Sequence, residues 1–404
     1  MGGGVPATLA DSVWNSAATL PILHEHPRVA RGGAPGSSAP STRGSEVAPA
    51  WNDGAMPDPT PHEPSLAEPI LHRAARIEDA VQEFREQRAR RRGLVPTVIP
   101  YTGYGAPGWV RVLARVLLTR RGLASDASYV GVRGWKSFTS VAVDSAEVTV
   151  TAGGRSHVVQ SDRGGVVDAI VPIDLEPGWR TIKLSAGGSR DVEADVFVVH
   201  PDTRFGLLSD IDDTVMVTSL PRPMLAAWNS FVLTEHARRP VPGMSVLYER
   251  VLAQHSGAPT VYLSTGAWNV APTLQRFLTR NMYPTGTLLL TDWGPTHDRF
   301  FRSGQLHKQE NLRRLARDFP DVQWLLVGDD GQHDESLYGD FAREHPENVA
   351  GVAIRQLSTS EAVLAGGRSR AQERSRDSAA PWVFAPDGAG LWTELQRVGL
   401  LDDH

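Results

Sequence analysis

The 404-residue sequence contains no cysteine, and this absence excludes a disulfide framework, a thiolate nucleophile and a cysteine-based zinc site. It also contains no apolar run close to the ~18 residues that a membrane-spanning helix needs. Its first residues lack the basic and apolar segments of a secretory signal peptide. The net charge of −5 does not indicate the basic surface that binding to nucleic acid requires. We therefore expect a cytoplasmic protein that binds no nucleic acid and contacts membranes only peripherally.

The N-terminal region changes character near residue 64. Glycine, proline, alanine and serine dominate residues 1–63, and no hydrophobic period is sustained there. Such a segment buries too little apolar surface to offset the entropy lost on ordering, so we expect it to be disordered. Residues 64–94 have helical spacing instead, with apolar residues at Leu66, Ile70, Ile77, Val81 and Phe84.

Five arginines gather at the C-terminal end of this predicted amphipathic helix, namely Arg85, Arg88, Arg90, Arg91 and Arg92. One interpretation is a helix packed on its own domain with a solvated basic end, the usual meaning of a run of charges. The other is a basic amphipathic helix that rests on anionic lipid. We favour the first interpretation.

Residues 95–200 have a hydrophobic period of two. Short runs such as "WVRVLARVLLT", "AEVTVTAGG" and "WRTIKLSAG" are separated by Gly, Pro or Asp turns. Regularly spaced short strands of this kind predict an antiparallel β-sandwich of immunoglobulin-like type. The region contains no recognisable acid–base constellation, so we expect a structural or docking role.

Residues 201–362 alternate short apolar runs with amphipathic segments. The predicted strands are 205–209, 260–264, 286–291, 322–328 and 349–357, with helices at 246–255, 270–281 and 309–319. This alternation is typical of a parallel sheet covered on both faces, which binds ligands at the carboxyl ends of its strands. We expect residues 363–404 to form a linker and a C-terminal helix.

Polar side chains follow these predicted strands where each one ends. Asp210, Asp212 and Asp213 follow the first strand, and Ser264, Thr265 and Gly266 the second. The fourth strand is followed by three further acids, Asp329, Asp330 and Asp334. Lys308 lies at the start of the preceding predicted helix. Clustered carboxylates repel one another unless a cation holds them, and hard oxygen ligands suit Mg²⁺.

Simpler explanations account for single residues but not for the set. A calcium loop starting at Asp210 fails, because its sixth position is Val215 rather than Gly and its twelfth is Pro221 rather than Glu. A helix N-cap needs one acid rather than three. "GDDG" alone fits a tight turn, and a single Ser or Lys is usually an ordinary surface residue. The order and placement of all these groups together indicate a catalytic site.

The motifs "SDIDDT", "YLSTGAWN", "HKQENLRRLARDFP" and "LLVGDDGQHDESLY" resemble the four motifs of the haloacid dehalogenase superfamily of phosphotransferases. Over roughly 204–357 the chain resembles more narrowly the catalytic domain of the actin-patch-associated phosphatidate phosphatases. The resemblance implies a Rossmann-like parallel core. Two departures lie near the expected phosphate position: Asp330 stands where Ser is expected, and Thr265-Gly266-Ala267 replaces an Asn-Ser-Pro-like stretch.

This resemblance implies a role for each site residue. Asp210 would be the nucleophile that forms an aspartyl-phosphate, and Asp212 the general acid and base. Mg²⁺ would be held by Asp210, the backbone carbonyl of Asp212, and Asp329. The phosphoryl group would be bound by Ser264, Thr265, Gly266 and Lys308, while Asp330 and Asp334 would orient Lys308 or metal-bound water.

The spacing of the motifs predicts an open site. The stretch from Asp210 to Ser264 leaves room for a helical flap near 224–236 but not for a folded cap. An open site suits a bulky or surface-bound substrate. Aromatic residues considered for lining its mouth are Trp228, Phe231, Trp268, Trp293, Phe300 and Phe301, with Arg299 and Arg302 as candidates for steering an anionic substrate.

We therefore expect a Mg²⁺-dependent phosphatase that acts on phosphatidate or a related lipid phosphomonoester at a membrane surface. Two alternatives stay open. One is the same chemistry on another bulky phosphoester, such as a phosphoprotein or a phosphometabolite. The other is a non-catalytic scaffold whose acidic cluster only binds metal, although a scaffold has no physical need for the second acid at Asp212.

Overall fold

The computed structural model describes residues 81–120, 141–187, 189–217, 239–291, 297–331, 333–364 and 379–402, without the side chains of 297–303 and 364. All of them belong to the larger of the two compact units of the chain, Ser65–His404. Among the described residues, no helix is both long and apolar enough to cross a membrane. Several predictions fall outside this part of the chain: the disordered segment 1–63, the flap 224–236, and the aromatic and arginine side chains named for the mouth, except Trp268.

A helix over residues 81–91 precedes the first strand. Its contact with the following domain is made by Ala89, which is 5% exposed, and by Gln82, whose Nε2 donates to the carbonyl of Ala142 at 2.9 Å. Val81 and Phe84 are 52% and 63% exposed. The described part of the helix therefore packs on its own domain, as expected, and the arginines at its C-terminal end are exposed. The contact is made by a face of the helix other than that of Val81 and Phe84.

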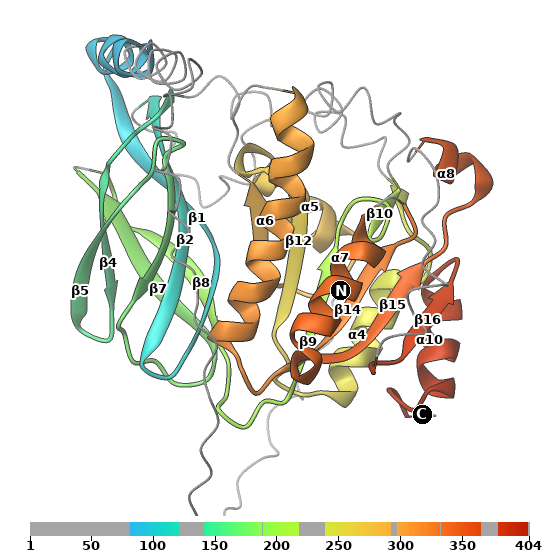
Figure 1. Ribbon diagram of the computed structural model, residues 1–404. Coiled ribbons are helices and arrows are strands. Elements are labelled where there is room, and N and C mark those ends of the chain that lie inside the picture. Colours follow the sequence, from blue (N-terminus) through green and yellow to red (C-terminus); the bar gives the residue numbers. More distant parts are fainter. Residues whose placement is uncertain are drawn as a thin grey trace, which may run out of the picture. The chain divides into compact units, whose positions relative to one another are not determined.

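The regular elements described in the first domain after this helix are all strands (Figure 1). Eight strands form one hydrogen-bonded sheet. The strand order is β3-β2-β1-β8-β7-β4-β5, with β6 paired to β2. All neighbours are antiparallel except β1 and β8. The strands are β1 (Leu94–Ala106), β2 (Trp109–Arg120), β3 (Val141–Ala142), β4 (Glu147–Ala152), β5 (Arg155–Gln160), β6 (Val166–Val171), β7 (Gly178–Ala186) and β8 (Val192–Val198).

The predicted strands of this domain are present, but the sequence did not indicate β1. Pro96 and Pro100 interrupt its pattern, and proline is depleted in strands because it lacks an N–H donor. Both prolines lie in the part of β1 that pairs only with β2, since β8 joins β1 at Gly103–Gly105. This strand, which pairs antiparallel on one side and parallel on the other, links all the strands into one sheet. The two separate sheets of an immunoglobulin-like sandwich are not confirmed.

The second domain contains a six-stranded parallel sheet in the order β13-β12-β9-β14-β15-β16. Along the chain, the strands lead from β9 through β12 to β13 at one edge of the sheet. They then continue from β14, on the other side of β9, through β15 to β16 at the opposite edge, which is the doubly wound arrangement. The strand order changes direction between β9 and β14, and such sheets bind their ligands at this position. The strands are β9 (Phe205–Asp210), β12 (Thr260–Ala267), β13 (Thr287–Thr291), β14 (Gln323–Asp329), β15 (Val349–Arg355) and β16 (Trp382–Ala385). A short pair, β10 (Met216–Val217) and β11 (Arg239–Pro240), stands apart.

Helices cover both faces of this sheet, as the alternating pattern predicts (Figure 1). α6 and α7 contact each other, and α4 contacts α10. Leu247 of α4 and Leu391 of α10 are fully buried in the same core as the central strands. The helices are α4 (Met244–Gln254), α5 (Ala271–Arg280), α6 (His297–Asp318), α7 (Asp334–Glu344), α8 (Thr359–Leu364) and α10 (Gly388–Arg397), with short 3-10 helices η4 (Trp268–Val270) and η5 (Pro346–Asn348).

α6 differs most from the sequence prediction. It begins at His297, whereas the sequence predicted a helix over 309–319 with Lys308 at its start. Gly304 discourages a helix by propensity, but here it allows a close approach. A Cβ at this position would stand 3.0 Å from Cγ2 of Thr265. Packing against the end of β12 thus outweighs local propensity, and Lys308 lies in the middle of a 22-residue helix.

Side chains of the first domain hold the C-terminal half of α6. Asp168 of β6 pairs with Arg111 of β2 at 2.5 Å and with Arg314 of α6 at 2.6 Å. The hydroxyl of Tyr104 in β1 donates to Asp318, the last residue of α6, at 2.8 Å. The all-β domain therefore supports the helix that carries Lys308.

Candidate active site

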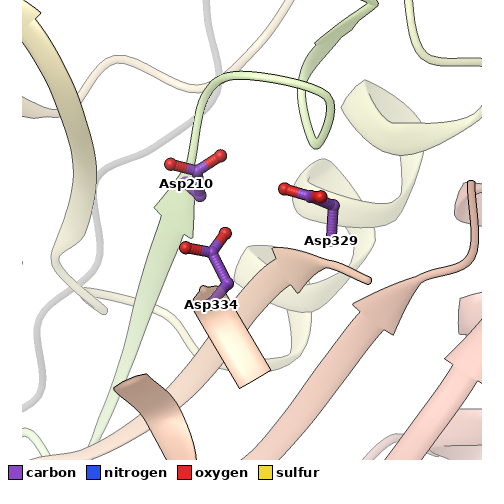
Figure 2. A group of neighbouring side chains, drawn as sticks. All are labelled: Asp210, Asp329 and Asp334. Carbon is purple, nitrogen blue, oxygen red and sulfur yellow. The ribbon is translucent and has the colours of Figure 1, made fainter. Parts of the chain in front are cut away.

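The site lies where the order of the parallel strands reverses. Asp210 is the last residue of β9, and Asp329 is the last residue of the neighbouring strand β14. Asp334 is the first residue of α7, which follows β14. Figure 2 shows these three carboxylates pointing toward one another. One carboxylate oxygen from each lies within 4.8 Å of the others, and all three residues are at most 3% exposed.

Lys308 reaches this acidic cluster from α6. Its Nζ lies 2.6 Å from Oδ1 of Asp210 and 2.7 Å from Oδ1 of Asp334. Burial alone would lower the pKa of Lys308, but the two carboxylates outweigh it and raise the pKa. Lys308 therefore carries a positive charge that compensates part of the negative charge of the cluster.

One ammonium group does not balance three carboxylates. Burial raises the pKa of Asp210 well above its ordinary value, and the carboxylate of Asp334 raises it further, while Lys308 opposes both. Burial, and then Asp334 and Asp210, likewise raise the pKa of Asp329. The raised pKa values of Asp210 and Asp329 favour their protonated forms in the isolated cluster, and a further cation would favour their ionised forms.

The cluster fits a hard divalent cation. Oδ2 of Asp334 is buried without a hydrogen-bond partner among the described residues, although an unsatisfied buried oxygen is costly. The possible metal ligands that converge here are carboxylate oxygens, and such ligands suit Mg²⁺ and similar ions. The residues present can therefore bind a metal ion, and the side chain of Asp334 belongs to the group together with Asp210 and Asp329.

Ser264 connects the next strand to the second acid of the motif. Its Oγ donates to Oδ2 of Asp212 at 3.1 Å and accepts the backbone N–H of Gly266 at 3.0 Å. β12 continues through Thr265 and Gly266, and the hydroxyl of Thr291 donates to the carbonyls of both residues at 2.9 and 3.2 Å. The residues predicted to bind phosphate thus lie beside Asp212, at a strand end that hydrogen bonds from Thr291 hold in place.

Arg355 stabilises the turn that follows Asp212. Asp213 adopts a φ of 59°, a left-handed conformation that Asp tolerates better than most residues. The carbonyl of Asp213 accepts Nη1 of Arg355 at 2.7 Å. The other guanidinium nitrogens donate to the carbonyl of Pro386 at 3.2 Å and to Glu361 at 2.8 Å. One buried arginine therefore joins the turn after Asp212 to two segments from the C-terminal part of the chain.

The remaining predicted residues have other surroundings. Oδ1 of Asp330 accepts the N–H of Leu357 at 2.8 Å and so holds the segment after β15. Its predicted role toward Lys308 or a metal-bound water stays a prediction. Trp268 is 5% exposed and stacks on Tyr101 at 4.8 Å between ring centroids. Trp268 also lines a cavity of about 610 Å³ with Val166 of the first domain. Its role at the mouth of the active site stays a prediction.

Arg355 is a site residue that sequence reasoning missed. It is the one charged residue in the apolar run "VAGVAIRQL", and a buried charge without a partner is costly. This single charge in an apolar run was the sequence feature that could have indicated a buried arginine with specific partners. Its partners could not be inferred, because Asp213 lies 142 residues earlier in the chain and Pro386 lies 31 residues later.

Comparison with known proteins identifies similar sequences for the second domain. Residues 205–356 match the family described as phosphatidate phosphatase APP1, catalytic domain. The phosphatidate phosphatase APP1 of Saccharomyces cerevisiae is 25% identical over 156 residues, 38% of this chain and 26% of that protein. An uncharacterized protein of Schizosaccharomyces pombe is 26% identical over 152 residues, 37% of this chain and 25% of that protein. The chain thus spans about a quarter of the length of these relatives.

Among solved structures, a carbohydrate acetylesterase from Xanthomonas citri aligns over 70% of this chain and 75% of its own. The identity is 11% and the TM-score 0.25, a similarity too low to bear on fold or activity. The resemblance of 204–357 to phosphatidate phosphatase catalytic domains is confirmed by the family match over 205–356. This match supports phosphoric monoester hydrolase activity for the segment 205–356.

Proposed function

We propose that the protein is a Mg²⁺-dependent phosphatase of the haloacid dehalogenase type that hydrolyses phosphatidate or a related lipid phosphomonoester. The observation that carries the proposal is the buried cluster of Asp210, Asp329 and Asp334 with Lys308. It lies inside the segment that matches a phosphatidate phosphatase catalytic domain. A purely structural core has no reason to gather three carboxylates at one strand edge, because each costs desolvation energy.

Asp210 is the proposed nucleophile. One of its carboxylate oxygens attacks phosphorus, a P–O bond to the aspartate forms, and the P–O bond to the leaving alkoxide breaks. Lys308, 2.6 Å from Oδ1 of Asp210, offsets negative charge on the nucleophile and on the transferred phosphoryl group. Water then attacks the aspartyl-phosphate, releases inorganic phosphate and regenerates the carboxylate.

Asp212 is the proposed general acid and base. It gives a proton to the leaving alkoxide in the first step and takes one from the attacking water in the second. Its side chain is only half-buried, which suits exchange of that proton with solvent. Ser264 holds Oδ2 of Asp212, and in the complex its hydroxyl and the N–H groups of Thr265 and Gly266 would bind phosphoryl oxygens.

The metal would be held by the carboxylates of Asp210 and Asp329 and by the backbone carbonyl of Asp212. Asp334 lies close enough to bind the ion directly or to orient its ligands. A bound Mg²⁺ supplies positive charge that allows an anionic nucleophile to approach an anionic substrate. This assignment explains why Asp334 has an unpartnered buried oxygen.

The test compares wild type with Asp210→Asn in a phosphate-release assay on phosphatidate vesicles and on soluble phosphoesters. We expect Asp210→Asn to lower kcat by about a thousandfold or more, as loss of a nucleophile commonly does. Chelation of divalent metal should abolish wild-type activity, and Mg²⁺ should restore it. The matched control is Asp321→Asn, the same change at an exposed aspartate.

The outcomes separate the alternatives. Full activity of Asp210→Asn would refute the covalent mechanism. Faster hydrolysis of soluble phosphoesters than of phosphatidate would favour another bulky phosphoester as the substrate. Metal binding by wild type without any phosphate release would favour the scaffold.

A further inference from the structure

The helix over residues 81–91 has two different faces. At 100° per residue, Gln82, Glu86 and Ala89 lie on one side. Ala89 and Gln82 contact the all-β domain, and Glu86 pairs with Arg90 on the same helix at 2.7 Å. Among the residues that the structure describes, this side of the helix makes the contacts with the domain.

The opposite side is apolar and basic, and it is exposed. Val81 and Phe84 are 52% and 63% exposed, and Arg85, Arg88 and Arg91 are exposed beside them. Their spacing of three and four residues puts all five on one face of the helix. An aromatic ring surrounded by guanidinium groups, without an acid on the same face, is the pattern of a helix that lies in a lipid interface.

The strand that follows shows on which side of the domain this helix lies. In β1, the carbonyl of Gly103 accepts from Thr287, the first residue of β13, at 3.2 Å. Two residues earlier in β1, the hydroxyl of Tyr101 donates to the carbonyl of Trp268, directly after the end of β12, at 3.2 Å. Going backward along β1 therefore leads from the amino-terminal edge of the parallel sheet to its carboxyl-terminal edge.

Tyr101 lies seven residue steps after the start of β1 at Leu94. At ~3.3 Å per residue, they carry the chain about 20 Å further in the same direction. The helix precedes Leu94 and so lies beyond the carboxyl-terminal edge, where Asp210 ends its strand. The basic face and the catalytic cluster are thus on the same side of the second domain.

We propose that the face formed by Val81, Phe84, Arg85, Arg88 and Arg91 docks the protein on an anionic membrane surface and presents the catalytic edge to lipid phosphates. The proposal rests on the proposed lipid phosphatase function. Charge complementarity supports it, because the three exposed arginines of this face attract an anionic surface. The chain as a whole has a net charge of −5, so the attraction is local to this face. Phe84 supports a membrane over nucleic acid, since phosphate contacts alone would not need an exposed aromatic ring.

The test is flotation of the full-length protein with vesicles of phosphatidylcholine alone or with phosphatidylserine, an anionic lipid that carries no phosphomonoester. We expect wild type to bind the anionic vesicles, and high salt to weaken binding. Arg85→Gln/Arg88→Gln should reduce binding by about tenfold or more, as expected for two basic residues at a charged surface. Phe84→Ser should reduce binding at both low and high salt, because its contribution is apolar.

The matched control is Arg155→Gln/Arg190→Gln, which removes two exposed arginines from the same domain and should leave binding unchanged. A soluble phosphoester reports on the active site separately. The helix variants should hydrolyse it as wild type does while losing activity on anionic vesicles that contain phosphatidate.

Several results would overturn the proposal. These are wild type that does not float with anionic vesicles, helix variants that float as well as wild type, or a control pair that loses as much binding as the helix pair. Loss of binding to a nucleic acid but not to vesicles would assign the face to a different partner. Absence of activity on every phosphoester would instead refute the proposed function, while vesicle binding would still report on the helix.

Discussion

The guanidinium of Arg355 is 5% exposed and donates to acceptors in three separate segments. Lysine keeps the charge but lacks the planar fork that spans these acceptors. We expect Arg355→Lys to lower the free energy of unfolding by about 1–3 kcal/mol, because at least one buried carbonyl loses its donor. Urea denaturation measures this change.

The same substitution should affect catalysis through Asp212. Release of the Asp213 carbonyl lets the turn move, and a small displacement of a catalytic group costs rate rather than ground-state binding. We expect kcat to fall about tenfold or more with KM nearly unchanged. Arg343→Lys, at an exposed arginine paired with Asp340, is the control. Equal effects of both variants would show that Arg355 does not position the turn.

At the scale of residues, the sequence identified the groups that follow strand ends. Asp210 and Asp329 could be predicted as neighbours because parallel strands end at one edge, and the structure brings them together. The pairing of Lys308 with Asp334 could not be derived in the same way. It depends on how far along α6 the lysine lies, and the sequence predicted the wrong start for that helix.

At the scale of elements, Gly328 allows α7 to begin next to β14. A Cβ at this position would stand 2.7 Å from Cε2 of Tyr338 and 2.9 Å from Cβ of Asp334. Because both atoms belong to α7, Gly328→Ala should displace the start of this helix and withdraw Asp334 from Lys308. We expect a loss of about 1–3 kcal/mol in unfolding free energy, as for other overpacked sites, together with a loss of phosphatase activity.

Gly339→Ala is the matched control within the same helix. A Cβ there meets nothing closer than 3.9 Å, so the change should be neutral or stabilising, since alanine favours helix over glycine. Thermal unfolding and a phosphate-release assay on both variants distinguish the two positions. Similar behaviour of the two variants would contradict the close packing described for Gly328.

The five predicted strands of the parallel sheet are present because their apolar runs are continuous and buried on both faces. β16 was missed for the opposite reason. It is four residues long, its pattern of half-buried and buried residues is short, and it lies at the edge of the sheet. Its position depends on pairing with β15, through Val352 and Arg355 among others, which no local pattern reveals.

At the scale of the whole molecule, Asp168 joins the all-β domain to α6 through Arg111 and Arg314. Burial alone would raise the pKa of Asp168, but the two arginines outweigh it and lower the pKa below its ordinary value. A carboxyl group with a lowered folded-state pKa stabilises the protein above its unfolded pKa, near 3.9. That stabilisation is lost as the pH falls from there through the folded-state pKa.

We therefore expect Asp168→Asn to lower the free energy of unfolding by about 1–2 kcal/mol at neutral pH, a value for a partly exposed ion pair. The difference from wild type should be the same at pH 5 and should shrink below about pH 4. Urea denaturation at several pH values measures it. Asp191→Asn, at an exposed aspartate, should show no such pH dependence, and a constant difference for Asp168→Asn would contradict the assignment.

The contacts between the all-β domain and the parallel sheet also bear on the order of folding. Tyr101 and Trp268 are 167 residues apart in the chain, Gly103 and Thr287 are 184 apart, and Tyr104 and Asp318 are 214 apart. Closing such long loops lowers the conformational entropy of the chain before any contact between the domains compensates for this loss. Each sheet should therefore form first from its nearer partners, and the seam between the domains should close last, with the stacking of Trp268 on Tyr101 as its optical signal.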